Sequence, residues 1–171
     1  EPHNLTQPVI MDARVKQIDG YRFVYVLPIS PVHLFIEDTY YSDSAVLDVP
    51  ALQSRIADYA ATHRWQVTRV LRQETGVLPV VKSGNLNDYW RAGGERVPKI
   101  GARGGFFHAV TSYSLPHAVR TAMAVAETPD LSAPALNAML KARAAKLWKD
   151  DRFFQMLNVM LFDAAEPEER Y

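Results

Sequence analysis

Two adjacent carboxylates, Glu37 and Asp38, lie in an apolar segment whose alternation predicts a β-strand. Because successive strand residues point to opposite faces, the two acids cannot both enter one pocket. Phe35 and Thr39 share the side of Glu37, so we expect Glu37 to face an enclosed apolar space. Desolvation there favours a protonated carboxyl, which a general acid acting on a hydrocarbon requires. The alternative is that Glu37 lies solvated at the end of a strand, as most carboxylates do.

A second candidate is the glycine-rich segment from Gly101 to Gly105, which precedes a predicted helix. Glycines let a backbone approach a phosphate or a flavin ring, and a helix N-terminus favours an anion. The spacing matches neither a Walker loop nor the dinucleotide fingerprint. Gly104 and Gly105 are equally compatible with an ordinary turn.

Several function classes are excluded by composition. The chain has no Cys, and its five His are dispersed, so we expect no metal site. Lys plus Arg and Asp plus Glu each number 19, which argues against nucleic-acid binding. No stretch approaches the roughly 20 apolar residues of a transmembrane helix. The sequence opens at Glu1 without an initiator Met or a leader, which we interpret as the start of an internal fragment.

The first half of the chain predicts an antiparallel sheet and one helix. Strands are expected over residues 9–17, 21–27 and 32–39, with a tight turn at Asp19-Gly20. Asp48 is typical of a helix N-cap, with Pro50 in the first turn. Residues 67–81 are expected to be extended, and residues 83–97 to form a loop carrying Tyr89 and Trp90.

The second half predicts helices. One begins near Ser114, a second is capped by Ser132, and a third carries Phe153 and Phe154. We interpret the Phe153 helix as core rather than as a cofactor motif. The predicted fold class is therefore α+β, an antiparallel sheet followed by helices.

Several strings resemble bacterial lycopene β-cyclases, members of the flavin-dependent carotenoid cyclase family, in both order and spacing. These strings are residues 8–13, 19–25, 27–28, 36–41, 104–108, 113–116 and 153–158, together with Thr111. The resemblance implies the substrate-side domain of a flavoprotein with a hydroxybenzoate-hydroxylase-like architecture. It divides the chain into a substrate-side sheet domain (1–97), a flavin-contacting segment with its helix (98–126) and a helical substrate-side segment (127–171). The nucleotide-binding half of the parent, with its glycine fingerprint, is expected to lie outside this chain.

The resemblance also implies roles for individual residues. The family's Phe-Leu-Glu-Glu-Thr motif corresponds to Phe35–Thr39, so Glu37 is the implied catalytic acid, and Asp38 takes the place of the second acid. We add the hypothesis that Tyr25, Tyr40 or Tyr41 supports it by cation–π stabilisation. The implied cofactor-binding residues are Gly104, Gly105, Phe107, His108, Thr111, Tyr113 and Ser114. Two positions depart from the family, Ala109 where Pro is usual and Ser112 where Gly is usual.

The activity that the resemblance implies is the cyclisation of the acyclic ends of lycopene to β-rings, without net redox change. The implied cofactors are reduced FAD, with NADPH as the reductant, and the implied location is cytoplasmic at a membrane surface. One alternative is a flavin-dependent monooxygenase, which would consume NADPH stoichiometrically. The other is a non-enzymatic lipid-binding domain, in which Glu37→Gln would abolish no activity.

Overall fold

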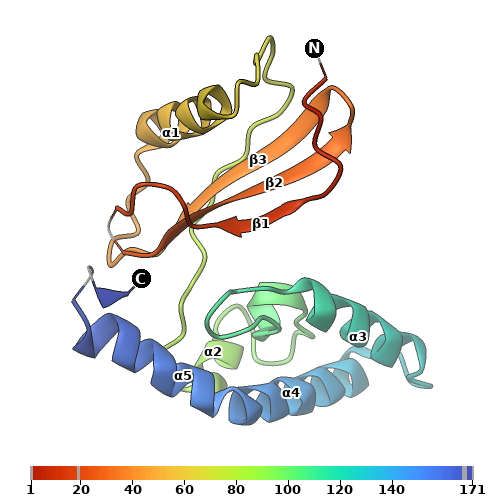
Figure 1. The fold of residues 1–171 in the computed structure, drawn as a ribbon. Coiled ribbons are helices and arrows are strands. Elements are labelled where there is room, and N and C mark those ends of the chain that lie inside the picture. Colours follow the sequence, from red (N-terminus) through yellow and green to blue (C-terminus); the bar gives the residue numbers. More distant parts are fainter. Residues whose placement is uncertain (1, 19, 167–168, 171) are drawn as a thin grey trace. The chain divides into compact units, whose positions relative to one another are not determined.

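The computed structural model describes residues 2–18, 20–166 and 169–170, which form two compact units (Figure 1). Unit 1 comprises residues 1–77 and 165–171, and unit 2 comprises residues 78–164. Asp19 of the predicted Asp19-Gly20 turn lies outside the described residues.

Unit 1 contains an antiparallel three-stranded sheet, which confirms the α+β class. Its strands are β1 (Val9–Asp12), β2 (Arg22–Ser30) and β3 (His33–Tyr40), in the order β1-β2-β3. The first strand was predicted to reach residue 17 but ends at Asp12. The reason is local: Met11 has a φ of +56°, and the pairing with β2 shifts register between Val9 and Asp12.

The helix α1 (Val49–Thr62) covers one face of this sheet (Figure 1). Its predicted N-cap is confirmed, because Asp48 Oδ1 accepts the N–H of Ala51 at 3.0 Å. Tyr59 of α1 packs with Val24 and Val26 of β2, and both valines have no exposed surface. Burial of this apolar face holds unit 1 together.

Unit 2 corrects one prediction. Residues 86–91, expected in a loop, form the short helix α2 (Leu86–Arg91). Residues 67–81, which were expected to be extended and lie mostly in unit 1, contain neither helix nor strand. Asn85 caps α2 by accepting the N–H groups of Asn87 and Asp88, and Trp90 is only 1% exposed. The helix was missed because six residues carry little periodicity, and the burial of Trp90 is a tertiary effect.

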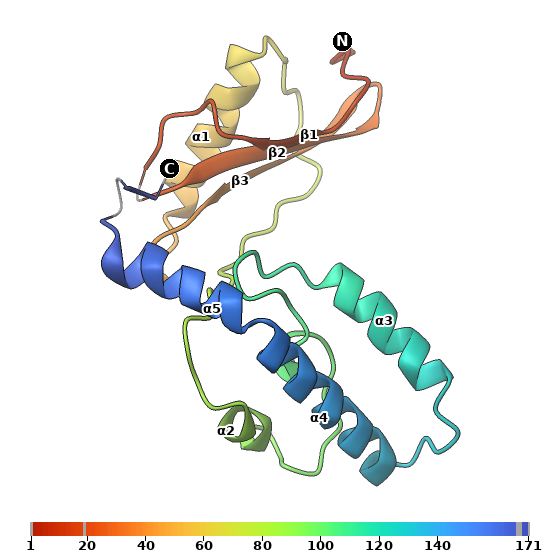
Figure 2. The ribbon, with the colours of Figure 1, turned by 60° about the horizontal axis from the view of Figure 1, so that its bottom comes forward.

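Three longer helices complete unit 2: α3 (Leu115–Ala126), α4 (Ala133–Asp150) and α5 (Arg152–Val159). A 3₁₀ turn, η1 (Gly101–Gly104), precedes α3, and a π-helical turn (Met160–Ala164) follows α5. Figure 2 shows α4 running on into α5. Trp90, Phe106, Leu140 and Ala144 form the core of the unit. None of the described helices has the length and apolar character needed to cross a bilayer.

Candidate active site on the sheet face that carries Glu37

Glu37 lies on the face of the sheet opposite α1. The strand alternation puts Phe35, Glu37 and Thr39 on this face, and Thr39 Oγ1 donates a hydrogen bond to Glu37 Oε1 at 2.9 Å. Glu37 is exposed, although the sequence predicted an enclosed space. The reason is that α1, the helix among the described residues of unit 1, packs on the opposite face of the sheet.

Several aromatic side chains lie on the same face of the sheet as Glu37. Tyr25 is its register partner on β2. The ring of Phe23 lies 5.3 Å from that of Tyr25, 5.4 Å from Tyr21 and 6.4 Å from Tyr41. We call Tyr21, Phe23, Tyr25 and Tyr41 the aromatic face. A carboxyl beside π faces is an arrangement that can deliver a proton and then stabilise a nearby cation.

Asp38 lies on the other face of the sheet, where it forms an ion pair with Arg22. Arg22 donates to both Asp38 oxygens, with Nη2 to Oδ2 at 2.6 Å and Nε to Oδ1 at 2.9 Å. The Asp38 side chain has no exposed surface, and Arg22 Nη1 also donates to the carbonyl of Lys16. The guanidinium and carboxylate therefore compensate each other under α1, since a buried charge needs a partner.

Tyr40 is also on the α1 side of the sheet. The guanidinium of Arg55, from α1, stands 5.3 Å from the centre of the Tyr40 ring. Of the three tyrosines predicted to support Glu37, the structure therefore places Tyr25 and Tyr41 on the face of Glu37 and Tyr40 on the other.

The glycines of the second candidate segment are explained by packing within unit 2. A Cβ on Gly104 would lie 2.7 Å from the Phe106 ring and 2.8 Å from the carbonyl of Lys99. Gly105 ends η1 with a φ of +77°, and its N–H donates to Ala102. Neither glycine needs a ligand to account for its presence.

The following residues form a loop whose hydrogen bonds are largely internal. His108 Nδ1 faces the N–H groups of Val110 and Thr111 at 3.3 and 3.4 Å, and the Thr111 hydroxyl at 3.3 Å. The N–H of His108 donates to Tyr113, and that of Ser112 donates back to His108. His108 and Thr111 thus shape the loop. Phe107 is half-buried, and its neighbour Phe106 belongs to the core.

The N-terminus of α3 fits an anionic cofactor better than the glycines do. Tyr113 and Ser114 are exposed, and Ser114 makes no side-chain cap to the helix. The first-turn N–H groups therefore have no side-chain cap, and the positive end of the helix dipole favours an anion. Burial, followed by the charge of Arg120, lowers the pKa of His117 in this turn and favours the neutral imidazole.

Sequence reasoning missed the partner of Asp38 and a buried acid, Asp12. Arg22 shares the inward face with Val24 and Val26, and an inward Arg on a strand is a signal that a carboxylate must lie nearby. Asp12 accepts a 2.9 Å hydrogen bond from the Tyr59 hydroxyl and is 8% exposed. Nothing in the local sequence pattern links Asp12 to Tyr59, which is 47 residues away.

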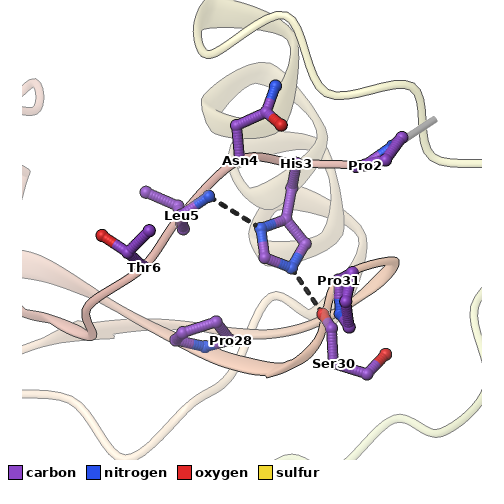
Figure 3. Close-up of a pocket in the computed structure, with 8 residues that line it drawn as sticks. All are labelled: Pro2, His3, Asn4, Leu5, Thr6, Pro28, Ser30 and Pro31. Carbon is purple, nitrogen blue, oxygen red and sulfur yellow. Dashed lines mark hydrogen bonds between the residues drawn. The ribbon is translucent and has the colours of Figure 1, made fainter.

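A surface pocket near the β2–β3 turn is a weaker candidate for an active site than the sheet face that carries Glu37. Residues 2–6 line it together with Pro28, Ser30 and Pro31 (Figure 3). Both ring nitrogens of His3 are engaged there, Nε2 with the Ser30 carbonyl at 2.6 Å and Nδ1 with the N–H of Leu5 at 3.0 Å. The described residues also contain no group of three His, Asp or Glu that could hold a metal ion.

Comparison with known proteins shows the family to which the chain belongs. The family model described as lycopene cyclase protein matches residues 1–171, the whole chain. The chain belongs to the lycopene cyclase family. The resemblance inferred from the sequence strings is thereby confirmed.

Curated members of the lycopene cyclase family give the same result. The chain is 43% identical over 171 residues to the lycopene β-cyclase of Pseudescherichia vulneris and 42% identical over 170 residues to that of Pantoea ananas. It is also 42% identical over 174 residues to the lycopene β-cyclase of Paracoccus sp. (strain N81106 / MBIC 01143). These matches cover 99–100% of this chain but 44% of each relative, so the chain spans less than half the length of these relatives. No solved structure matches the chain significantly.

Proposed function

We propose that the intact protein cyclises the acyclic ends of lycopene to β-rings, with Glu37 as the proton donor. The observation that carries the proposal is the match of the whole chain to relatives named lycopene β-cyclase. The geometry supports it, because Glu37 stands beside the aromatic face while Asp38 is held by Arg22.

The reaction is balanced without an oxidant or a reductant. Glu37 delivers a proton to a terminal alkene, a carbon–carbon bond closes the ring, and a tertiary cation forms. Transfer of a neighbouring proton to solvent or back to the Glu37 carboxylate then gives the β-ring, so substrate and product are isomers. Thr39 donates to Glu37 Oε1 and so orients the carboxyl. The rings of Tyr25 and Tyr41, which both pack against the buried Phe23, stabilise the cation through their π faces.

We further propose that the intact protein carries FAD, which is kept reduced by NADPH. When bound, a reduced flavin supplies negative charge that stabilises a developing cation. The exposed Tyr113 and Ser114 and the uncapped first turn of α3 support a contact with it. Gly104, Gly105, His108 and Thr111 support it indirectly, by packing and by shaping the loop that leads to α3.

A hydrocarbon substrate also bears on location. Lycopene partitions into the bilayer because it has no polar group to hydrate. We therefore propose that the intact protein associates with the cytoplasmic face of the membrane as a peripheral protein.

Glu37→Gln in the intact protein tests the proposed function. The amide cannot deliver the proton, so conversion of lycopene in a lycopene-accumulating host should fall by about 10² to 10⁴-fold. Glu74→Gln, at an exposed position of unit 1, is the matched control and should leave conversion unchanged. Full conversion by Glu37→Gln would refute Glu37 as the acid.

Cofactor stoichiometry separates the cyclase from the monooxygenase alternative. With purified intact protein and NADPH, cyclised product should accumulate well beyond the NADPH oxidised. Oxidation of one NADPH for each product molecule would instead identify a monooxygenase. No conversion of lycopene by the folded, flavin-loaded protein would favour a binding domain.

A further inference from the structure

Asn158 on α5 is fully buried and donates two hydrogen bonds across unit 2. Its Nδ2 lies 2.8 Å from the carbonyl of Val81 and 2.8 Å from the carbonyl of Ala109. Val81 and Ala109 belong to two segments far apart in sequence, neither of which is part of a helix or strand. One side chain therefore joins two irregular segments.

The peptide groups of Ala109 are held from both sides. Its N–H donates to Asp151 Oδ2 at 3.3 Å, and its carbonyl accepts from the N–H of Val81 at 3.0 Å as well as from Asn158. Asp151 and Asn158 are two helical turns apart, which brings them to the same face of α5. Ala109 supplies an N–H that a proline at this position would lack.

The same two segments meet at a second point. Ser112 Oγ donates to the carbonyl of Pro79 at 2.5 Å. The segments 79–81 and 108–113 are thus joined by Val81 to Ala109, by Ser112 to Pro79 and by the Asn158 amide. We call these contacts the Asn158 clamp.

The chemistry of the clamp requires an amide nitrogen. Both neighbours of Nδ2 are carbonyl oxygens, so the orientation of the Asn158 amide is fixed by its surroundings. Its Oδ1 is buried and has no hydrogen-bond partner among the described residues. A buried acceptor without a partner costs stability, so the favourable contribution of Asn158 comes from the two hydrogen bonds that Nδ2 donates.

We propose that Asn158 is the positioning residue of the loop 108–113, through which it fixes the entry into α3. It acts through Ala109 and touches neither substrate nor cofactor. The link to catalysis rests on the proposed function, in which Tyr113, Ser114 and the start of α3 contact the flavin. The link to the loop rests on the clamp alone.

Asn158→Leu in the intact protein removes both donors at similar volume, and hydrogen–deuterium exchange reads the result. Exchange in peptides covering 79–82 and 108–114 should become at least about tenfold faster, since two buried hydrogen bonds are lost and the loss of one can change an equilibrium by up to about tenfold. Asn137→Leu is the matched control, because Asn137 donates from α4 to the carbonyl of Glu95 and not to the loop. It should leave exchange at 79–82 and 108–114 unchanged.

Asn158→Asp separates the donor from the volume of the side chain. The carboxylate has the same shape but no donor, whereas the protonated acid regains one O–H. Loop exchange in this variant should therefore be fast at neutral pH and partly restored at acid pH, relative to wild type at each pH. Asn158→Leu should show no such pH-dependent rescue, and its retained flavin should absorb differently from that of the wild type.

The outcomes separate the two proposals. If peptides 79–82 and 108–114 exchange as fast in the wild-type protein as in Asn158→Leu, the positioning role is overturned, whether or not the protein cyclises lycopene. If exchange is faster in Asn158→Leu and the wild-type protein cyclises no lycopene, the clamp is upheld and the proposed function is refuted. If Asn158→Leu does not fold, the acid rescue of Asn158→Asp decides the matter, and its absence overturns the role.

Discussion

At the residue scale, the pleat of a single strand gives two neighbouring acids different environments. Glu37 stands exposed beside the aromatic face, and Asp38 is buried with Arg22. The same alternation sorts the tyrosines, because Tyr25 and Tyr41 lie on the face of Glu37 and Tyr40 lies under Arg55. Chemical type alone does not assign a role to these residues.

The tyrosines yield a prediction that the structure makes selective. Tyr25→Leu and Tyr41→Leu in the intact protein should each lower lycopene turnover by about tenfold, since a desolvated cation–π contact contributes up to about 2 kcal/mol. Tyr40→Leu is the control and should leave turnover unchanged. Turnover measured per folded protein checks this, and unchanged turnover in all three variants would end the cation–π hypothesis.

Asp12 gives unit 1 a dependence on acid. The hydrogen bond from the Arg14 side chain is the main cause that lowers the pKa of Asp12 from 3.8 to about 2. Burial opposes this effect by raising the pKa, and the hydrogen bond from the Tyr59 hydroxyl adds to the lowering. Since the folded-state pKa is the lower one, the stabilisation is complete above pH 4 and is lost as the pH falls toward 2. Arg14 is 86% exposed, so solvent screens its part of this stabilisation.

Asp12→Asn should therefore unfold more easily than wild type at pH 7, and the difference should shrink between pH 4 and pH 2. Urea unfolding followed by circular dichroism across this range measures it. Asp58→Asn, at an exposed position of α1, should follow the wild-type pH dependence. A constant difference between Asp12→Asn and wild type at all pH values would contradict the assignment.

At the element scale, the ends of helices and turns follow local rules, while the loop before α3 departs from them. Ser112 has a φ of +55°, in the left-handed region that favours glycine. This agrees with the glycine that the resemblance led us to expect at that position. Ser112 retains the conformation with the help of its hydrogen bond to Pro79.

Two substitutions separate the strain from the hydrogen bond. Ser112→Ala loses the bond and keeps the strain, so it should lower the free energy of unfolding by about 1 kcal/mol. Ser112→Gly loses the same bond but gains about 1 kcal/mol by relieving the left-handed strain, and should stay near wild type. Chemical denaturation checks both. Equal losses in the two variants would show that the backbone at Ser112 is unstrained.

At the scale of the whole molecule, each unit is organised around its own core. Val24, Val26 and Tyr59 form that of unit 1, and Trp90 and Leu140 are central to that of unit 2. Burial of these side chains is the main favourable contribution in each unit.

Leu140→Ala tests the core of unit 2. A cavity at a position that is 2% exposed should lower the free energy of unfolding by about 2–5 kcal/mol and speed hydrogen exchange in α2 and α4. Leu131→Ala, at a position that is 62% exposed, should change it by less than about 0.5 kcal/mol. Similar losses in the two variants would mean that the core is assigned wrongly.

The sequence by itself determined the elements that local rules control, and the family. Alternation predicted the three strands and the opposite faces of Glu37 and Asp38, and the Asp48 cap set the start of α1, because these depend on residues close in the chain. Only the tertiary structure decided the partners. Arg22 with Asp38, Asp12 with Tyr59 and Asn158 with Ala109 are separated by 16, 47 and 49 residues. Such pairs form because burial leaves each polar group no water to bond with, and no local pattern specifies which distant group will meet it.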